Sequence, residues 1–186
     1  HTAFTGGINL ADEYINQKER FGYWKDACLM LKGDAVRDFT LMFLQMWNVV
    51  EYVKLPRAER EKADDHLLEE YRRYIQMPIP KCSEEGKGFV IPYDDNPLDD
   101  EQVGELVYLD ILNTAKKYVH IMTPYLVLDH NMIVTLTYAA KRGVDVKIIM
   151  PHIPDKKYAF ILARTFYNEL LDAGVEIYEF LPGFVH

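Results

Sequence analysis

The chain has little cysteine and lacks several familiar catalytic patterns. Its 186 residues include two cysteines, Cys28 and Cys82, which are far apart and form no CxxC pair. A disulfide framework and a cysteine-rich zinc site are therefore not expected, and we expect both thiols to be reduced. The sequence has no glycine-rich nucleotide loop, no serine nucleophile elbow and no HExxH zinc helix. These absences leave the chemistry to be found elsewhere in the sequence.

Long hydrophobic runs are also missing. The densest apolar run, residues 39–50, is interrupted by Thr40, Gln45 and Asn48. A transmembrane helix needs about 20 predominantly apolar residues, so this segment is not expected to span a membrane. There is no initiating methionine and no signal peptide, and both ends of the chain lie inside predicted strands. We therefore expect an internal piece of a longer protein.

An excess of positive charge is absent as well. Lys and Arg number 21 against 29 Asp and Glu, a formal net charge of −8. This balance argues against a nucleic-acid partner, because binding that does not depend on sequence needs a basic face. The charge is uneven, however: residues 114–165 hold eight basic and three acidic side chains. That stretch suits an anionic substrate, although exposed helix faces that happen to be basic explain it equally well.

Apolar residues make up 49% and charged residues 27% of the chain, as in a globular protein. Residues 2–10 and 23–33 are typical of strands, and the apolar stripe of residues 35–50 predicts a helix. After residue 100 the pattern predicts helices and strands in alternation, at 100–117, 118–125, 131–142, 144–151, 156–173 and 175–182. Such alternation predicts an α/β fold with a mainly parallel sheet flanked by helices. The apolar run of residues 144–151 predicts a strand buried on both faces.

Composition divides the chain into three parts, 1–53, 54–102 and 103–186. In the middle part, a charged helix is predicted after Pro56, followed by a linker rich in proline, glycine and charge. In parallel α/β sheets, ligands meet the loops at the carboxyl ends of strands. The third part has three such ends, at residues 123–125, 151–155 and 180–186. We therefore expect Tyr125 and Asp155 to line a cleft.

Two motifs at the ends of the chain carry a resemblance to a known superfamily. Gly6-Gly7-Ile8-Asn9 resembles the end of H-x-K-x4-D-x6-G-[SG]-x-N, which the phospholipase D superfamily carries twice. Gly183-Phe184-Val185-His186 resembles the lead-in to the second copy, ending at its histidine. Six blocks are similar to bacterial cardiolipin synthases: 5–16, 24–33, 35–48, 123–129, 139–151 and 167–186. The chain thus resembles the region between the two HxK motifs of such an enzyme.

The resemblance implies a two-lobed phospholipase D-like fold. Residues 1–53 would end the first lobe, 54–102 would form an inter-lobe insertion, and 103–186 would begin the second lobe. It also implies phosphatidyl transfer between two phosphatidylglycerol molecules through a phosphohistidine, giving cardiolipin and glycerol with no metal and no cofactor.

The resemblance assigns roles to four residues. His186 would be the second catalytic histidine, as nucleophile or as general acid and base. Asn9 would bind the substrate phosphate, with Gly6 and Gly7 allowing a close backbone approach, although a plain β-bulge would also explain the two glycines. One histidine and both lysines of the paired motifs are absent, so the segment alone is not expected to be active.

Two other functions stay open. One is a different phosphodiesterase of the superfamily, a phospholipase D or a nuclease, and the other is a non-catalytic lipid-binding module. We expect phosphatidylglycerol and membrane lipid as partners, and the bacterial inner (cytoplasmic) membrane as the location of the parent protein. The isolated segment should be soluble and should self-associate through the strand edges exposed where the lobes are cut.

Overall fold

The structure is a computed structural model that describes residues 2–56, 59, 69–78, 88–95 and 101–186. The chain divides into two compact units. The first unit comprises residues 1–5 and 29–101, and the second comprises residues 6–28 and 102–186. The three-part division expected from composition stays a prediction.

The first unit contains a strand pair and a long helix. Strand β1 (Thr2–Gly6) pairs with β3 (Cys28–Lys32). Helix α1 (Ala35–Lys54) starts after Gly33, whose φ of 100° favours glycine, and confirms the predicted helix. Of the charged helix predicted after Pro56, residues 59 and 69–76 are described as helical, and the rest lies outside the described residues. Much of the predicted linker lies outside them too.

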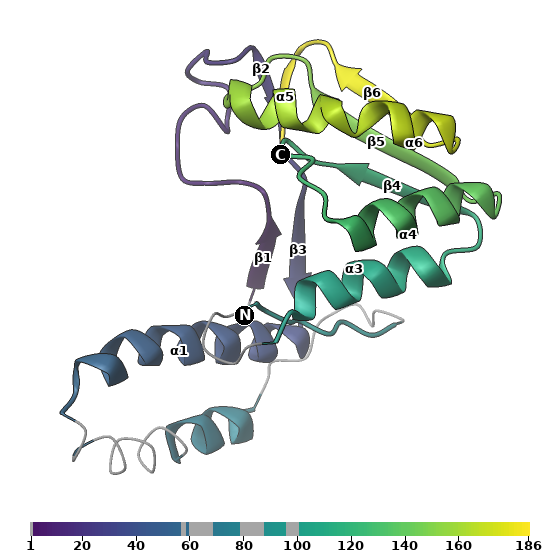
Figure 1. The fold of residues 1–186 in the computed structure, drawn as a ribbon. Helices are drawn as coiled ribbons and strands as arrows, with labels where there is room; N and C mark the ends of the chain where they lie inside the picture. Colours follow the sequence, from purple (N-terminus) through teal and green to yellow (C-terminus); the bar gives the residue numbers. More distant parts are fainter. Residues whose placement is uncertain (1, 57–58, 60–68, 79–87, 96–100) are drawn as a thin grey trace. The chain divides into compact units, whose positions relative to one another are not determined.

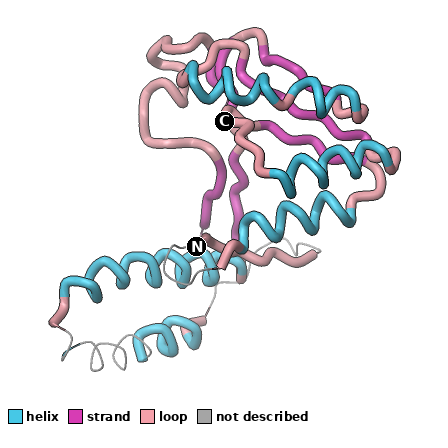
Figure 2. Tube along the Cα trace, in the orientation of Figure 1, coloured by secondary structure: helices cyan, strands magenta, loops and turns pink. Residues whose placement is uncertain are grey.

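The second unit contains a three-stranded parallel sheet with helices packed on it (Figures 1 and 2). The strand order is β4-β5-β6, with β4 at Tyr118–Met122, β5 at Asp145–Pro151 and β6 at Glu176–Phe180. The helices are α3 (Val103–Thr114), α4 (His130–Lys141), α5 (Lys157–Thr165) and α6 (Tyr167–Asp172). The α/β class and the parallel sheet are therefore confirmed.

The core of this unit lies on one face of the sheet. Val146, Ile148 and Met150 alternate along β5 and are buried, together with Leu136 of α4 and Leu170 of α6. The residues between them on β5 face the other way, and they include polar side chains. The expectation that residues 144–151 are buried on both faces is wrong, because this strand alternates between core and surface.

Two predicted elements are each divided in two. Residues 23–33 form β2 (Tyr23–Lys25) and β3, separated at Asp26 and Ala27. Residues 156–173 form α5 and α6, which meet at Phe166. Strand β2 leaves β3 because it pairs in parallel with β7 (Gly183–Val185), an arrangement that the sequence did not predict. This pairing brings residues near the two ends of the sequence together inside one unit.

Across the described residues, no helix combines the length and the apolar character needed to cross a lipid bilayer.

Candidate functional site around His186

The β2–β7 pair holds the backbone of His186. The His186 N–H donates to the carbonyl of Lys25 at 3.1 Å, and the His186 carbonyl accepts from the N–H of Ala27 at 3.2 Å. The side chain is 30% exposed. The local fold therefore fixes the histidine and still leaves it open to a ligand.

A hydrogen bond to Gly7 fixes the orientation and the tautomer of the His186 ring. Its Nδ1 lies within hydrogen-bond distance of the Gly7 carbonyl oxygen. A carbonyl oxygen can only accept, so Nδ1 must donate and carries a proton. In the neutral ring the lone pair is then on Nε2. This is the tautomer that a nucleophile or a general base acting through Nε2 requires.

The two predicted glycines lie where the backbone approaches its neighbours very closely. A Cβ on Gly7 would lie 2.7 Å from both Nδ1 and the carbonyl carbon of His186, and one on Gly6 would lie 2.2 Å from the Ala27 carbonyl oxygen. Both positions exclude any side chain. The Gly7 N–H already donates to the Ala27 carbonyl at 3.1 Å, so Gly7 contributes space and a carbonyl acceptor.

Asp26 is a member of the site that the motifs did not indicate. Its side chain is 3% exposed, and its Oδ1 lies 3.6 Å from Nδ1 of His186. Both carboxylate oxygens are buried without a hydrogen-bond partner. Burial raises the pKa of Asp26, and positive charge on His186 opposes that shift. The available sequence signal was a carboxylate inside the apolar stretch of residues 23–33.

Aromatic rings form a wall beside His186 and place Asn9. Trp24 and Phe184 are buried with ring centroids 4.4 Å apart, and Tyr14 lies 4.6 Å from Trp24. The Tyr14 ring also meets His186 edge-on, at 6.0 Å between centroids. The amide of Asn9 donates to the Tyr14 hydroxyl at 2.7 Å. Asn9 is therefore linked to His186 through one tyrosine.

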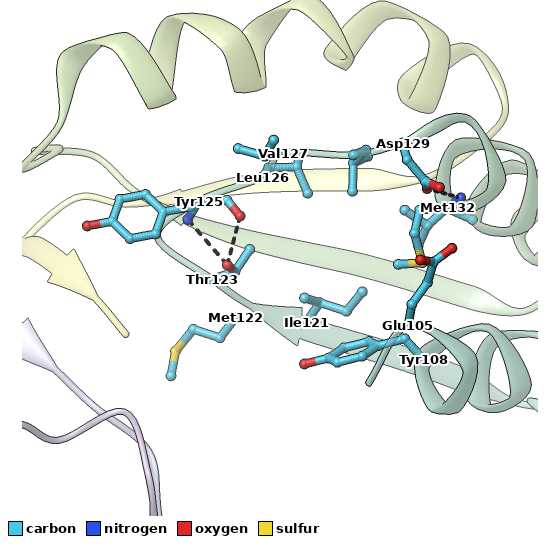
Figure 3. Close-up of a pocket in the computed structure, with 12 residues that line it drawn as sticks. Glu105, Tyr108, Ile121, Met122, Thr123, Tyr125, Leu126, Val127, Asp129 and Met132 are labelled. Carbon is cyan, nitrogen blue, oxygen red and sulfur yellow. Dashed lines mark hydrogen bonds between the residues drawn. The ribbon is translucent and has the colours of Figure 1, made fainter. Parts of the chain in front are cut away.

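Tyr125 and Asp155 form a second group after the ends of β4 and β5. The Tyr125 hydroxyl donates to Asp155 Oδ2 at 2.6 Å, and the ammonium of Lys156 lies 4.6 Å from the ring centroid. Thr123 Oγ1 fixes the backbone of Tyr125 through two hydrogen bonds of 3.2 Å (Figure 3). Burial raises the pKa of Tyr125, and its hydrogen bond to Asp155 raises it further. Among the described residues, no hydrogen bond or ring contact joins this pair to His186.

Some basic residues of the stretch 114–165 are engaged with their neighbours. Lys147 lies 2.7 Å from Asp145 and 3.9 Å from Glu176 on the polar face of the sheet. Arg142 donates to the Leu112 carbonyl at 2.7 Å. These contacts fit the alternative in which the basic residues serve local structure.

Comparison with known proteins bears on this site. Residues 108–186, which end at the histidine, match the family described as "Cardiolipin synthase, PLD-like domain". This part of the chain is similar to that family. The sequence-based resemblance to bacterial cardiolipin synthases is thereby confirmed, and so is the phospholipase D-like fold class.

Relatives extend the similarity to nearly the whole chain. An uncharacterised protein of Streptococcus mutans is 56% identical over 99% of this chain and 36% of its own length. "Cardiolipin synthase" of Geobacillus thermodenitrificans is 36% identical over 98% of this chain and 33% of its own length. "Cardiolipin synthase 2" of Bacillus cereus is 36% identical over 98% of this chain and 32% of its own length. The chain thus spans about a third of these relatives. No solved structure matches it significantly.

Proposed function

We propose that the protein containing this chain is a phosphatidyltransferase that makes cardiolipin from two phosphatidylglycerol molecules, releasing glycerol, and that His186 takes part in the transfer. The presentation of His186 is the observation that carries this proposal. Within a segment similar to cardiolipin synthases, one histidine is anchored by its backbone, oriented through Nδ1 and partly exposed.

In this mechanism one histidine attacks phosphorus through the Nε2 lone pair. A P–N bond forms, and the bond from phosphorus to the oxygen of the headgroup glycerol breaks. A second histidine gives its proton to the leaving alkoxide, and glycerol departs. That histidine then takes a proton from the terminal hydroxyl of the second phosphatidylglycerol, whose oxygen attacks phosphorus as the P–N bond breaks. Either role requires Nε2, so His186 is suited to both.

Asp26 and Gly7 support either role from the opposite side of the ring. Positive charge develops on the imidazole when it attacks phosphorus or accepts a proton. A carboxylate whose Oδ1 is 3.6 Å from Nδ1 stabilises that charge, and the Gly7 carbonyl keeps the ring from turning. Asn9, whose amide donates one N–H to the Tyr14 hydroxyl, would bind a phosphate oxygen through its second N–H.

The resemblance assigns the partner histidine and both lysines to positions outside residues 1–186. The proposal therefore concerns the full-length protein, for which we also propose a location at the cytoplasmic membrane and phosphatidylglycerol as donor and acceptor. The similarity to proteins named cardiolipin synthase supports this assignment.

Product analysis tests the proposal. The purified full-length protein is incubated with phosphatidylglycerol vesicles, and lipids and free glycerol are quantified. Cardiolipin and glycerol in equal amounts are the expected products. Phosphatidic acid with glycerol would indicate a phospholipase D that uses water, and would overturn the transferase assignment. Absence of turnover in vesicles and in detergent would favour a lipid-binding module.

A further inference from the structure

A cavity of about 450 Å³ lies beside strand β4, in a part of the second unit that the proposed chemistry does not use. Its walls come from α3, β4, the loop of residues 123–129 and the start of α4 (Figure 3). Much of the lining is aliphatic or thioether, from Ile121, Met122, Leu126, Val127, Leu128 and Met132. Its volume falls within the range of small-molecule sites, about 300–1,000 Å³. The walls therefore suit an apolar ligand.

The two ends of the cavity differ in charge. Figure 3 shows Tyr125 at one end and Glu105 with Asp129 at the other. At the Tyr125 end, the phenol is bonded to Asp155 and the ammonium of Lys156 lies over the ring. At this end the charges of Asp155 and Lys156 balance, whereas the far end has the two carboxylates of Glu105 and Asp129. A negatively charged headgroup is thus repelled less at the Tyr125 end.

The Tyr125 end also lies at the edge of the three-stranded sheet from which the loop after β5 reaches β7. Tyr125 follows the carboxyl end of β4, and the loop after β5 meets the start of β7 through a hydrogen bond from the Ile153 N–H to the Gly183 carbonyl, 3.3 Å. Strand β7 leads directly to His186. A ligand whose headgroup binds at this edge would extend its apolar tail along the cavity, away from His186.

We propose that the cavity binds one acyl chain of an anionic phospholipid, with the headgroup towards Tyr125 and Lys156. This inference rests on the proposed function for the identity of the lipid. Two methionines in the wall, Met122 and Met132, have flexible side chains that adapt to chains of different shape. The carboxylates at the far end keep a second charged group out, so a neutral hydrocarbon tail is the part that fits inside.

A photoreactive lipid tests the proposal on the full-length protein. Vesicles contain phosphatidylglycerol with a diazirine at the end of one acyl chain, and labelled peptides are mapped by mass spectrometry after irradiation. The label is expected at the far end of the cavity, on Glu105, Tyr108 or Met132. Val127→Trp should reduce that labelling at least fivefold, because Val127 lines the cavity and is 60% exposed. Val134→Trp is the matched control, at a 49% exposed valine of α4 outside the lining, and should leave labelling unchanged.

Chain-length preference gives a second readout. Each methylene that Val127→Trp excludes should cost roughly fourfold in kcat/KM for long-chain phosphatidylglycerol. The preference should therefore shift towards shorter chains, and Val134→Trp should show no shift. Label confined to other parts of the protein, or equal behaviour of the two variants, would overturn the proposal.

The two proposals fail in different ways. Label at the far end of the cavity together with phosphatidic acid as product would refute cardiolipin synthesis and retain the acyl-chain site. Cardiolipin production without label in the cavity would retain the activity and refute the acyl-chain site.

Discussion

Replacing Asp26 by asparagine should have opposite effects on the stability of the protein and on its activity. The carboxylate is buried, lacks hydrogen bonds and lies against Nδ1 of His186. Asparagine keeps the shape of the side chain and removes its charge. We expect Asp26→Asn to make the protein more stable at neutral pH and less active.

The sign of the stability change follows from the pKa. Burial raises the pKa of Asp26 above its ordinary value of 3.8, so the native state binds this proton more tightly than the unfolded state. Its contribution is therefore favourable at low pH and is lost as the pH rises through the raised pKa. At neutral pH the buried carboxylate without hydrogen bonds costs more than the neutral amide that replaces it, so Asp26→Asn should raise the free energy of unfolding. Removing the group should also remove this pH dependence.

The activity change follows from the distance. A unit positive charge on the ring, 3.6 Å from a carboxylate oxygen, gains about 4–5 kcal/mol at an effective dielectric constant of about 20. Loss of most of that energy in the transition state predicts a fall in kcat of about 10²–10³-fold. Cardiolipin formation and thermal unfolding are measured on the same full-length preparations. Asp172→Asn, at an exposed position of α6, is the matched control and should change neither.

Two results would refute this reasoning. Activity within threefold of the unsubstituted protein would mean that Asp26 does not stabilise charge on His186. A lower unfolding temperature would mean that the buried carboxylate has a stabilising partner in the full-length protein.

Three further substitutions test the site and the core. Gly7→Ala should lower kcat by at least tenfold and destabilise the protein by about 1–3 kcal/mol, because the new Cβ would lie 2.7 Å from Nδ1 of His186. Tyr14→Phe removes the acceptor that holds Asn9, and should lower kcat by about 2–13-fold, the equivalent of about 0.5–1.5 kcal/mol for one hydrogen bond. Leu136→Ala, at a fully buried side chain, should lower the free energy of unfolding by about 2–5 kcal/mol.

Each of these changes has a control of the same type. Gly174→Ala also strains the backbone, at a φ of 95°, but its Cβ meets no atom within 4 Å, so activity per folded molecule should stay unchanged. Tyr158→Phe alters a 73% exposed tyrosine and should leave kcat unchanged. Leu171→Ala alters a half-exposed leucine and should cost much less stability than Leu136→Ala. If a substitution and its control had equal effects, the contact on which that prediction depends would be contradicted.

The regular half of the fold could be predicted from local pattern. Strands β4, β5 and β6 and the helices between them follow from apolar periodicity and from the glycines that end α4 and α6. The prediction that β5 is buried on both faces was wrong, because an apolar run such as Ile148-Ile149-Met150 does not show which side chains meet a helix. The pairing of β2 with β7 could not be predicted either, because about 160 residues separate the strands and no short-range signal marks their register.

The candidate site was predictable only in part. The motifs indicated Gly7, Asn9 and His186, and the structure brings these three together, although their catalytic roles stay a prediction. Asp26 and Tyr14 were missed because their importance depends on the β2–β7 pairing. Self-association of the isolated segment also stays a prediction, which light scattering would test.

Substitution of His186 tests the central claim most directly. The full-length protein and its His186→Asn variant are assayed for cardiolipin and glycerol from phosphatidylglycerol vesicles, with His130→Asn, an exposed histidine at the start of α4, as control. If His186 takes part in the transfer, His186→Asn should lose about 10²–10⁴-fold in kcat while its unfolding temperature stays close to that of the control. Cardiolipin formation by His186→Asn at the rate of the unsubstituted protein would show that the transfer does not use this histidine.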